Sequence, residues 1–382
     1  MRAVVSTIGR FHSFNQARQL QERGALEAIF TGYPRVKLGN TGVDPARIRS
    51  FPWLIAPYMA LVRFHWFQRT LERDWAWKAH RAHDRHVART LPPCDVVIAL
   101  SGLGLATGRT AQARGARYVC DRASTHKAFQ NDILHDEYAR HGFTFAGIDP
   151  RNMAQELEEY QVADAITVPS GFVRQTFIDR GVPAERLILT PYGGDLGRFR
   201  PLGPKAPEFR VLFVGQLAVR KGLPDLLEGF ARAAIPGARL VLVGGEQPET
   251  RAMLGRARTP VECLGMQFGD DLVREMAQAS VMVLPSVEEG MALVMAMTMA
   301  CGTPVIASHN TGAADLFTDG VEGFHIPIRD PDAIADRLTR LAADPTLRAD
   351  MGHAARRRVE SFGGWAAYGD RLWAGLERLL SA

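Results

Sequence analysis

The sequence has 382 residues, of which 46% are hydrophobic and 23% charged, and its formal net charge at pH 7 is +5. A chain of this length is too long for one typical hydrophobic core, so we expect two domains. The mild positive charge suits an anionic small ligand or an anionic membrane surface, but it is too weak to indicate nucleic acid binding. We therefore expect a soluble globular protein without a nucleic acid partner.

The four cysteines are scattered along the chain and form no C-x-x-C pair, which argues against structural zinc and favours a reducing compartment. No cluster of Asp and His has the spacing of metal ligands, so we expect no bound metal and no cofactor. The chain opens directly on a predicted strand, without a signal peptide. Its longest apolar stretch, residues 51–62, is interrupted by prolines and too short to cross a bilayer. These features predict a cytoplasmic protein.

Residues 2–6 predict a buried strand, which leads through a loop into a helix over residues 15–23. Gly24 follows as a helix stop. A strand, a turn that contains Gly9, and a helix make a Rossmann-like opening, although the G-x-G-x-x-G pattern is missing.

Residues 51–86 are rich in aromatic side chains, and basic residues outnumber acidic ones there. An aromatic and basic helical segment can lie in a membrane interface, so peripheral contact with the inner face of a membrane is one prediction. A pair of helices packed on the N-terminal sheet is the other. The tryptophans of this segment are Trp53, Trp66, Trp75 and Trp77.

Residues 95–100 and 116–120 predict two further buried strands, and Asp121 and His126 follow the second one. A His just past the end of a strand can hydrogen-bond a sugar hydroxyl or share a proton near a reacting centre. An ordinary core or surface position explains a lone His as well, so both interpretations of His126 stay open. Glu137, in the next predicted helix, is a second candidate on this side.

The segment 201–207, rich in Pro and Gly, predicts the linker between the domains. Residues 210–214 then predict a strand that ends at Gly215, and Arg220 and Lys221 stand directly before the next predicted helix. Two cations beside a glycine can reach the oxygens of a departing diphosphate. Solvated surface charge is the alternative, but a place directly after a buried strand favours a binding role.

The most informative stretch is residues 280–308. An apolar run over residues 281–284 predicts a buried strand, and a helix rich in Ala, Met and Leu follows an acidic pair. In open α/β sheets, ligands lie at the carboxyl ends of strands and face helix N-termini. Backbone N–H groups over residues 290–293 can hold a phosphate there, with Glu289 of the acidic pair beside it.

The run PSVEEGMALVMAMTMACGTPVIAS in this stretch resembles the donor-site signature of family-4 retaining glycosyltransferases of the GT-B fold. That signature reads P-S-x-x-E-G-F-G-L-x-x-x-E-A-M-A-C-G-x-P-V-I-A. Glu289 stands at its first Glu, and Met297 stands at its second. Two other parts are similar to the family. They are the R-K-G turn of the second half and residues 163–201, where a V-P-S turn precedes a D-x-x-x-F-x-P run.

The resemblance implies an α/β protein of the GT-B fold, with two Rossmann-like parallel-sheet domains facing each other across a cleft. It implies an acceptor-side domain over residues 1–200 and a nucleotide-sugar-binding domain over residues 208–364. A last helix over residues 365–382 would cross back to the first domain.

The resemblance also implies roles for single residues. Arg220 and Lys221 would contact the diphosphate of the donor, and Glu289 and His126 would contact its sugar as further catalytic residues. Met297 would lie at the ribose, where the family has a Glu, and Met accepts hydrogen bonds poorly. The other implied donor contacts are Gly9, Asp121, Gly215, Gly290, Met291, Ala292 and Leu293. A plain turn explains Gly9 equally well.

The implied function is transfer of a sugar from a nucleotide-sugar donor to the hydroxyl of a glycan, glycolipid or lipid-linked acceptor. The family implies retention of configuration and a place in cell-envelope polysaccharide biosynthesis, and we expect no metal ion to take part. Two alternatives remain open. The chain can be a non-catalytic relative that binds a nucleotide sugar or glycan, because Met297 removes a ribose partner. It can also be another GT-B enzyme, such as a phosphorylase or an epimerase.

Overall fold

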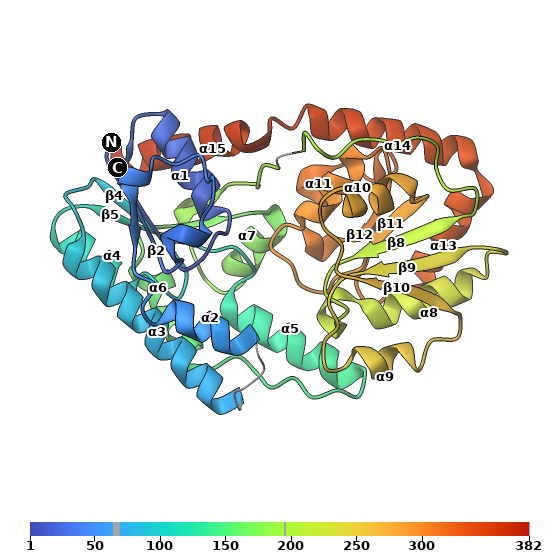
Figure 1. Ribbon diagram of the computed structural model, residues 1–382, viewed down its shortest axis with the longest axis horizontal. Coiled ribbons are helices and arrows are strands. Elements are labelled where there is room, and N and C mark those ends of the chain that lie inside the picture. The colour runs from blue at the N-terminus through green and yellow to red at the C-terminus, as the bar shows by residue number, and fades with distance from the viewer. Residues whose placement is uncertain (64–68, 195, 382) are drawn as a thin grey trace.

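The computed structural model describes residues 1–63, 69–194 and 196–381, and it has two α/β domains side by side (Figure 1). Trp66 of the aromatic segment lies outside the described residues. Each domain is built on one parallel sheet with helices around it. The prediction of two Rossmann-like parallel-sheet domains is therefore confirmed.

The first sheet has seven strands in the order β3-β2-β1-β4-β5-β6-β7. Most of its strands are short apolar runs buried on both sides, as expected where helices cover both faces of a parallel sheet. The strand order reverses between β1 and β4, which pair in register with Val4 beside Val97. The strands are β1 (Ala3–Thr7), β2 (Leu26–Thr31), β3 (Ile48–Ser50), β4 (Val96–Leu100), β5 (Arg117–Asp121), β6 (Ala165–Val168) and β7 (Leu187–Leu189).

The helices of the first domain are α1 (Ser13–Glu22), α2 (Ile55–Arg63), α3 (Arg69–Thr90), α4 (Leu105–Ala113), α5 (Lys127–Arg140), α6 (Pro150–Val162) and α7 (Gly171–Ile178). Short 3-10 turns are η1 (Arg35–Lys37), η2 (Pro45–Arg47) and η3 (Ala184–Arg186). Helix α3 contacts α2 and α4, and its Val87 lies in one core cluster with Val97 of the sheet. The described parts of the aromatic segment thus belong to two helices on the first domain, while its contact with a membrane stays a prediction.

The second sheet has six strands in the order β10-β9-β8-β11-β12-β13. Its strand order reverses between β8 and β11, and ligands of open α/β sheets bind at the carboxyl ends of strands next to such a reversal. The strands are β8 (Arg210–Val214), β9 (Arg239–Val243), β10 (Val261–Gly265), β11 (Val281–Leu284), β12 (Val305–Ser308) and β13 (Gly323–Ile326).

The helical segments of the second domain are η4 (Val219–Lys221), α8 (Leu223–Ala233), α9 (Thr250–Leu254), α10 (Gly269–Gln278), α11 (Leu293–Ala300), η5 (His309–Thr311), α12 (Ala313–Leu316) and α13 (Pro331–Ala343). Helix α11 begins later than the sequence indicates, because residues 290–292 form an extended connection against the first domain before the first helical turn. This connection places the carboxyl end of β11 at the junction between the domains.

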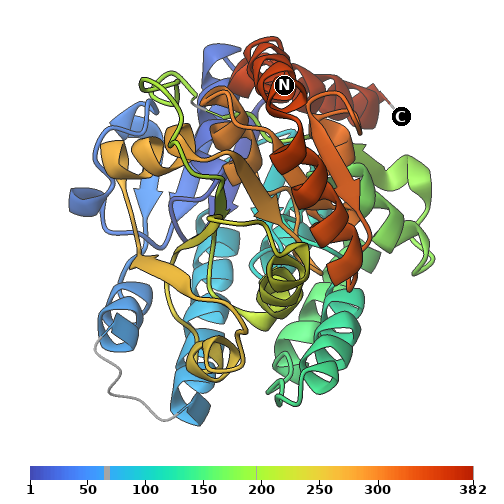
Figure 2. The ribbon, with the colours of Figure 1, turned by 90° about the vertical axis from the view of Figure 1, so that its right-hand side faces the viewer.

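The chain ends in α14 (Pro345–Glu360) and α15 (Gly364–Ser381), which lie along the top of the molecule in Figures 1 and 2. Helix α15 packs on α1 and β7 of the first domain. The Nε2 of Gln16 donates to the hydroxyl of Tyr368 at 3.0 Å. A Cβ on Gly375 would lie 2.4 Å from the Cγ2 of Ile188, so the helix approaches the sheet closely. The last helix therefore ties the two domains together.

Candidate active site at the domain junction

The turn η4 carries Arg220 and Lys221 and ends at Gly222, which has a φ of 69°. A Cβ on Gly222 would lie 2.1 Å from the carbonyl oxygen of Pro285, directly after β11. Only glycine fits both the left-handed backbone and this close approach. Gly222 therefore allows η4, with its two cations, to lie directly against the loop that carries Glu289.

Lys221 and Glu289 form an ion pair. Their side chains are 14% and 12% exposed, and the Nη1 of Arg220 lies 3.5 Å from the same carboxylate. Burial lowers the pKa of Lys221, with Glu289 acting in the opposite direction. Burial acts to lower the pKa of Arg220 too, but the attraction of Glu289 and Glu288 outweighs it and raises that pKa. Two cations and one carboxylate thus meet where the segments after β8 and β11 come together.

Glu288 is fully buried and points the other way, into the first domain. Its carboxylate accepts hydrogen bonds from Ser124 Oγ at 2.5 Å, Thr125 Oγ1 at 2.7 Å and Gln130 Nε2 at 3.1 Å. Arg220 donates to the backbone carbonyl of Glu288 at 2.7 Å. Burial acts to raise the pKa of Glu288, but Arg220 and the three donors of the first domain outweigh it and lower the pKa. Glu288 is therefore ionised at neutral pH.

Gly290 lies directly on the first domain. A Cβ there would lie 1.9 Å from the carbonyl oxygen of Ala123, and the carbonyl of Gly290 accepts from Ser170 Oγ at 2.6 Å. The Sδ of Met291 accepts from the backbone N–H of Tyr192 at 3.2 Å. The backbone N–H of Ala292, one of the groups predicted to bind phosphate, already donates a hydrogen bond to the carbonyl of Thr311 at 3.2 Å. Leu293 is the first residue of α11.

Asp121, at the end of β5, is buried and paired. Its carboxylate lies 2.7 Å from His12 Nε2 and accepts from Thr167 Oγ1 at 2.7 Å. Sequence reasoning did not select His12, although its place in the loop after β1 is the signal that could have found it. Gly9 lies in the same loop, where a Cβ would meet the ring of Phe11 at 2.9 Å.

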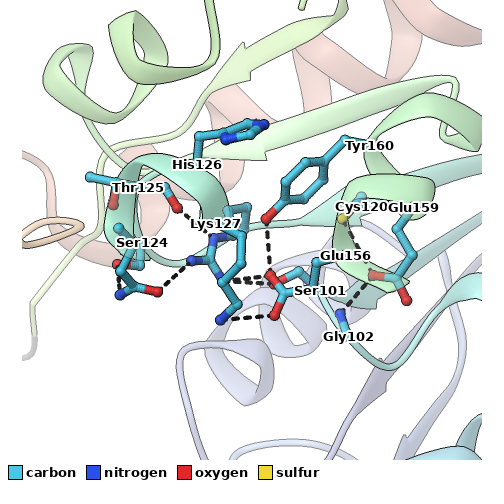
Figure 3. A network of polar contacts seen from close by, with 12 residues as sticks. Ser101, Gly102, Cys120, Ser124, Thr125, His126, Lys127, Glu156, Glu159 and Tyr160 are labelled. Carbon is cyan, nitrogen blue, oxygen red and sulfur yellow. Dashed lines mark hydrogen bonds and ion pairs between the residues drawn. The ribbon is translucent and has the colours of Figure 1, made fainter. Parts of the chain in front are cut away.

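His126 precedes α5 and packs between two aromatic rings, with centroids 5.1 Å from Tyr160 and 5.0 Å from Phe177. Its ring is shown above Tyr160 in Figure 3. Burial lowers its pKa to about 4, so the imidazole is neutral at pH 7. Its Nδ1 has no hydrogen-bond partner within the part of the chain that the structure describes. The sugar contact assigned to His126 stays a prediction.

A buried polar network lies beside His126 in the first domain (Figure 3). Glu156 is its centre, with Arg122 Nη1 at 2.8 Å, Lys127 Nζ at 2.9 Å and the Tyr160 hydroxyl at 2.9 Å. Arg122 also donates to Gln130 Oε1 at 3.2 Å, and Gln130 in turn reaches Glu288. The network therefore connects the first domain to the loop of the second domain that carries Glu289.

Two further predicted donor residues lie on the second domain. Gly215 directly follows β8, and its N–H donates to the carbonyl of Val243 at 2.9 Å. Met297 lies on α11 and packs against an apolar cluster that contains Leu212 and Val241. The structure thus assigns Met297 an apolar environment, and its contact with a ribose stays a prediction, as does the donor contact of Gly215.

One group of three possible metal ligands occurs among the described residues. Glu137, His141 and Asp225 have ligand atoms within 4.8 Å of one another. Two guanidinium groups already occupy this place, since Arg140 lies 3.0 Å from Asp225 and Arg329 lies 2.6 Å from Glu137. The cluster is an ion-pair network between the domains, and Glu137 belongs to it.

Comparison with known proteins identifies this class of fold. The structure of the Anabaena protein HepE in complex with UDP and glucose matches with a TM-score of 0.70 at 16% identity, over 99% of this chain and 100% of that chain. At this identity the match shows the fold alone, and the predicted GT-B fold is confirmed.

The second domain matches the family described as Glycosyl transferases group 1 over residues 208–344. A D-inositol 3-phosphate glycosyltransferase from Kribbella flavida is 29% identical over 262 residues, which are 66% of this chain and 56% of that protein. A GDP-mannose-dependent monoacylated alpha-(1-6)-phosphatidylinositol monomannoside mannosyltransferase from Corynebacterium glutamicum is 30% identical over 205 residues, 48% of this chain and 54% of that protein. The chain spans little more than half the length of these curated relatives. The predicted resemblance to group 1 glycosyltransferases is confirmed.

Proposed function

We propose that this protein is a glycosyltransferase that moves a sugar from a nucleotide-sugar donor to a hydroxyl acceptor. The observation that carries the proposal is the mostly buried ion pair of Lys221 and Glu289, with Arg220 beside it, at the domain junction. Two cations can bind the two phosphates of a donor, and a carboxylate can accept hydrogen bonds from sugar hydroxyls. The match of residues 208–344 to group 1 glycosyltransferases supports this assignment.

In the proposed reaction, the acceptor hydroxyl oxygen bonds to the anomeric carbon while the bond from that carbon to the diphosphate breaks. Negative charge grows on the diphosphate, and Arg220 and Lys221 stabilise it. Glu289, released from Lys221 when phosphate binds, holds a hydroxyl of the sugar. A diphosphate oxygen takes the acceptor proton on the face where the leaving group departs, which gives retention of configuration.

We propose that this chemistry needs neither a divalent metal ion nor a cofactor. The charge of the leaving group falls on Arg220, Lys221 and the N-terminus of α11, whose backbone carries a partial positive charge. Turnover should therefore be the same in EDTA as in magnesium. Loss of turnover in EDTA that magnesium restores would contradict this part of the proposal.

The donor and acceptor classes are supported by the relatives. One relative is named as dependent on GDP-mannose and as acting on a phosphatidylinositol mannoside, and a neighbouring structure contains UDP. We propose a glycan or lipid-linked acceptor in cell-envelope polysaccharide biosynthesis, reached in the cytoplasm at the inner face of the membrane. Among the described residues, no helix has both the length and the apolarity needed to span a bilayer. Trp53 is 75% exposed, so residues 51–86 can supply the peripheral contact.

A thermal-shift screen followed by product analysis tests the proposal. Nucleoside diphosphates and their sugars should raise the unfolding temperature, because a ligand that binds only the native state stabilises it. The nucleotide sugar with the largest shift should then lose its sugar to an acceptor or to water. Stabilisation without any release of nucleoside diphosphate would contradict the enzyme assignment.

The apolar environment of Met297 favours a second candidate function, which is binding of a nucleotide sugar without transfer. The screen separates the two, because a binding protein gives thermal shifts but no turnover. Among other GT-B enzymes, a phosphorylase would depend on added inorganic phosphate, and an epimerase would change the donor sugar without an acceptor.

A further inference from the structure

A cavity of about 580 Å³ lies between the two domains, apart from the pair of Lys221 and Glu289. Its wall on the first domain comes from α2, α3, the end of α5 and the loop after it, and its wall on the second domain comes from residues 247–252. In Figure 1 these elements meet at the lower edge of the molecule, where α5 points toward α9. The cavity is therefore bordered by both domains.

The second-domain wall of the cavity is bonded to the loop that carries the two cations. The Oγ1 of Thr250 donates to the carbonyl of Leu217 at 2.5 Å, and the N–H of Gln247 donates to Thr250 Oγ1 at 2.7 Å. On the other wall, Tyr138 lies on α5, which contacts η4 directly. A molecule in the cavity would thus lie beside the place proposed for the diphosphate.

Aromatic rings make up much of the first-domain wall. They come from Tyr58, Tyr138, Phe143 and Phe145. The rings of Tyr138 and Phe145 are 5.3 Å apart at 45° to each other, so they form an angled surface. Rings offer large rigid apolar faces, and the C–H faces of a sugar can lie on such faces while its hydroxyls point to polar groups.

The charged groups of the cavity favour hydroxyls over phosphate. Glu72 and Glu249 both line it, and carboxylates accept hydrogen bonds from hydroxyls but repel phosphate. The Tyr138 hydroxyl donates to Glu249 at 2.8 Å. Arg73 is the one cation among the described lining residues, and its Nη2 already donates to the carbonyls of Ala146 and Gly147 at 3.0 and 2.9 Å. A phosphate would therefore face two carboxylates and one engaged guanidinium.

We propose that this cavity is the acceptor subsite and that it binds an uncharged, hydroxyl-rich sugar ring, not a phosphorylated group. This inference rests on the proposed function, since it specifies the acceptor of the same reaction. It does not depend on the identity of the donor, because binding of the acceptor can be measured alone.

Saturation-transfer NMR on the full chain tests the subsite without turnover. The probes are methyl α-glucoside, methyl α-mannoside and glucose 6-phosphate. We expect at least one glycoside to bind, its affinity to fall about tenfold or more in Phe145→Ala, and the phosphate to bind more weakly than both glycosides. Binding of glucose 6-phosphate in preference to the glycosides, or glycoside binding unchanged in Phe145→Ala, would overturn the proposal. Absence of binding by all three probes would overturn it too.

Reversing the charge of Glu72 gives a more discriminating test of the subsite. Glu72→Lys should shift the preference toward glucose 6-phosphate by about tenfold or more, while Glu185→Lys, at an exposed position on η3, should not. In both variants the thermal shift by UDP and GDP should stay as in the parent protein, so a failed acceptor subsite is distinguished from a failed donor site. Equal preferences in both variants would contradict the subsite.

Discussion

The carboxylate of Glu288 in the second domain accepts a hydrogen bond of 2.7 Å from the hydroxyl of Thr125 in the first. The neighbouring carboxylate of Glu289 instead pairs with Lys221 of its own domain. The two adjacent carboxylates thus have partners in different domains, so this acidic pair faces both domains at once. Because Arg220 contacts Glu288 and Glu289, the position of the first domain and the position of the cation that we propose binds phosphate are set together.

Removal of the Glu288 carboxylate should loosen the domain junction. Glu288→Ala leaves buried donors on the first domain unsatisfied, which should lower the free energy of unfolding by about 3 kcal/mol. Glu288→Gln keeps one acceptor oxygen and should lose less. Small-angle scattering should show a larger radius of gyration for Glu288→Ala, and Glu185→Ala is the surface control. An unchanged radius and unchanged stability would show that the contact does not hold the domains.

Gly290→Ala should move the two domains apart, because Gly290 is a second contact of the same loop with the first domain. Its Cβ would lie 1.9 Å from the carbonyl oxygen of Ala123, so one domain must move. We expect a larger radius of gyration and at least a tenfold loss of sugar transfer. Gly245→Ala is the matched control for the radius, since its Cβ would meet no atom closer than 3.7 Å. Identical scattering from the two variants would contradict the close approach at Gly290.

Acid should destabilise the protein through histidines that are buried in the neutral form. Burial lowers the pKa of His83 to about 3 and that of His80 to about 4. In the unfolded chain both protonate near pH 6.5, so the unfolded state binds protons first as the pH falls. Above pH 6.5 these two histidines leave the free energy of unfolding unchanged with pH. As the pH falls from 6.5 toward 4, the free energy of unfolding decreases because only the unfolded state takes up the protons. Burial raises the pKa of Glu159 to about 7, and this carboxyl acts in the opposite direction.

A variant isolates the histidine effect from that of Glu159. Thermal unfolding of His83→Gln between pH 7.5 and 4.5 should show a shallower fall in midpoint than the parent protein does. The difference between the two curves should widen steadily below pH 6.5. Parallel curves would mean that folding does not lower the pKa of His83.

Met297→Glu should strengthen nucleotide binding. It places a carboxylate where the similar family has one for the ribose, and a hydrogen bond to a charged group contributes about 1.5–3 kcal/mol. We expect at least tenfold tighter binding of a nucleoside diphosphate by calorimetry, together with lower stability because Met297 packs on an apolar cluster. Met297→Leu is the control for packing alone. Equal affinities in both variants would place the ribose elsewhere.

The sequence predicted the features of the fold and site that depend on neighbouring residues. Short apolar runs mark most of the strands, and those of β8 and β11 are followed directly by Gly215 and Pro285. The cations of η4 stand next to a glycine that the backbone requires. Such signals are contained in a few consecutive residues. The two parallel sheets and the position of Arg220 and Lys221 between β8 and α8 could therefore be predicted from the amino-acid sequence alone.

Contacts between distant residues could not be predicted in this way. The neighbouring residues in the sequence do not distinguish Glu288 from Glu289. Only the position of Thr125 in the fold shows that the carboxylate of Glu288 bonds to the first domain. In the sequence His126 is a lone polar residue, and only the fold places Tyr160 and Phe177 around it. The later start of α11 has the same origin, since its cause is the close approach of the other domain.

Turnover of Lys221→Ala tests the central claim most directly. The measurement is release of nucleoside diphosphate from the nucleotide sugar that stabilises the parent protein most, with Lys37→Ala as an exposed control. Loss of one charge that stabilises the leaving diphosphate should lower kcat about 10²–10³-fold while the unfolding temperature stays near that of the parent. A Lys221→Ala protein that folds normally and retains kcat within a few-fold of the control would contradict the account.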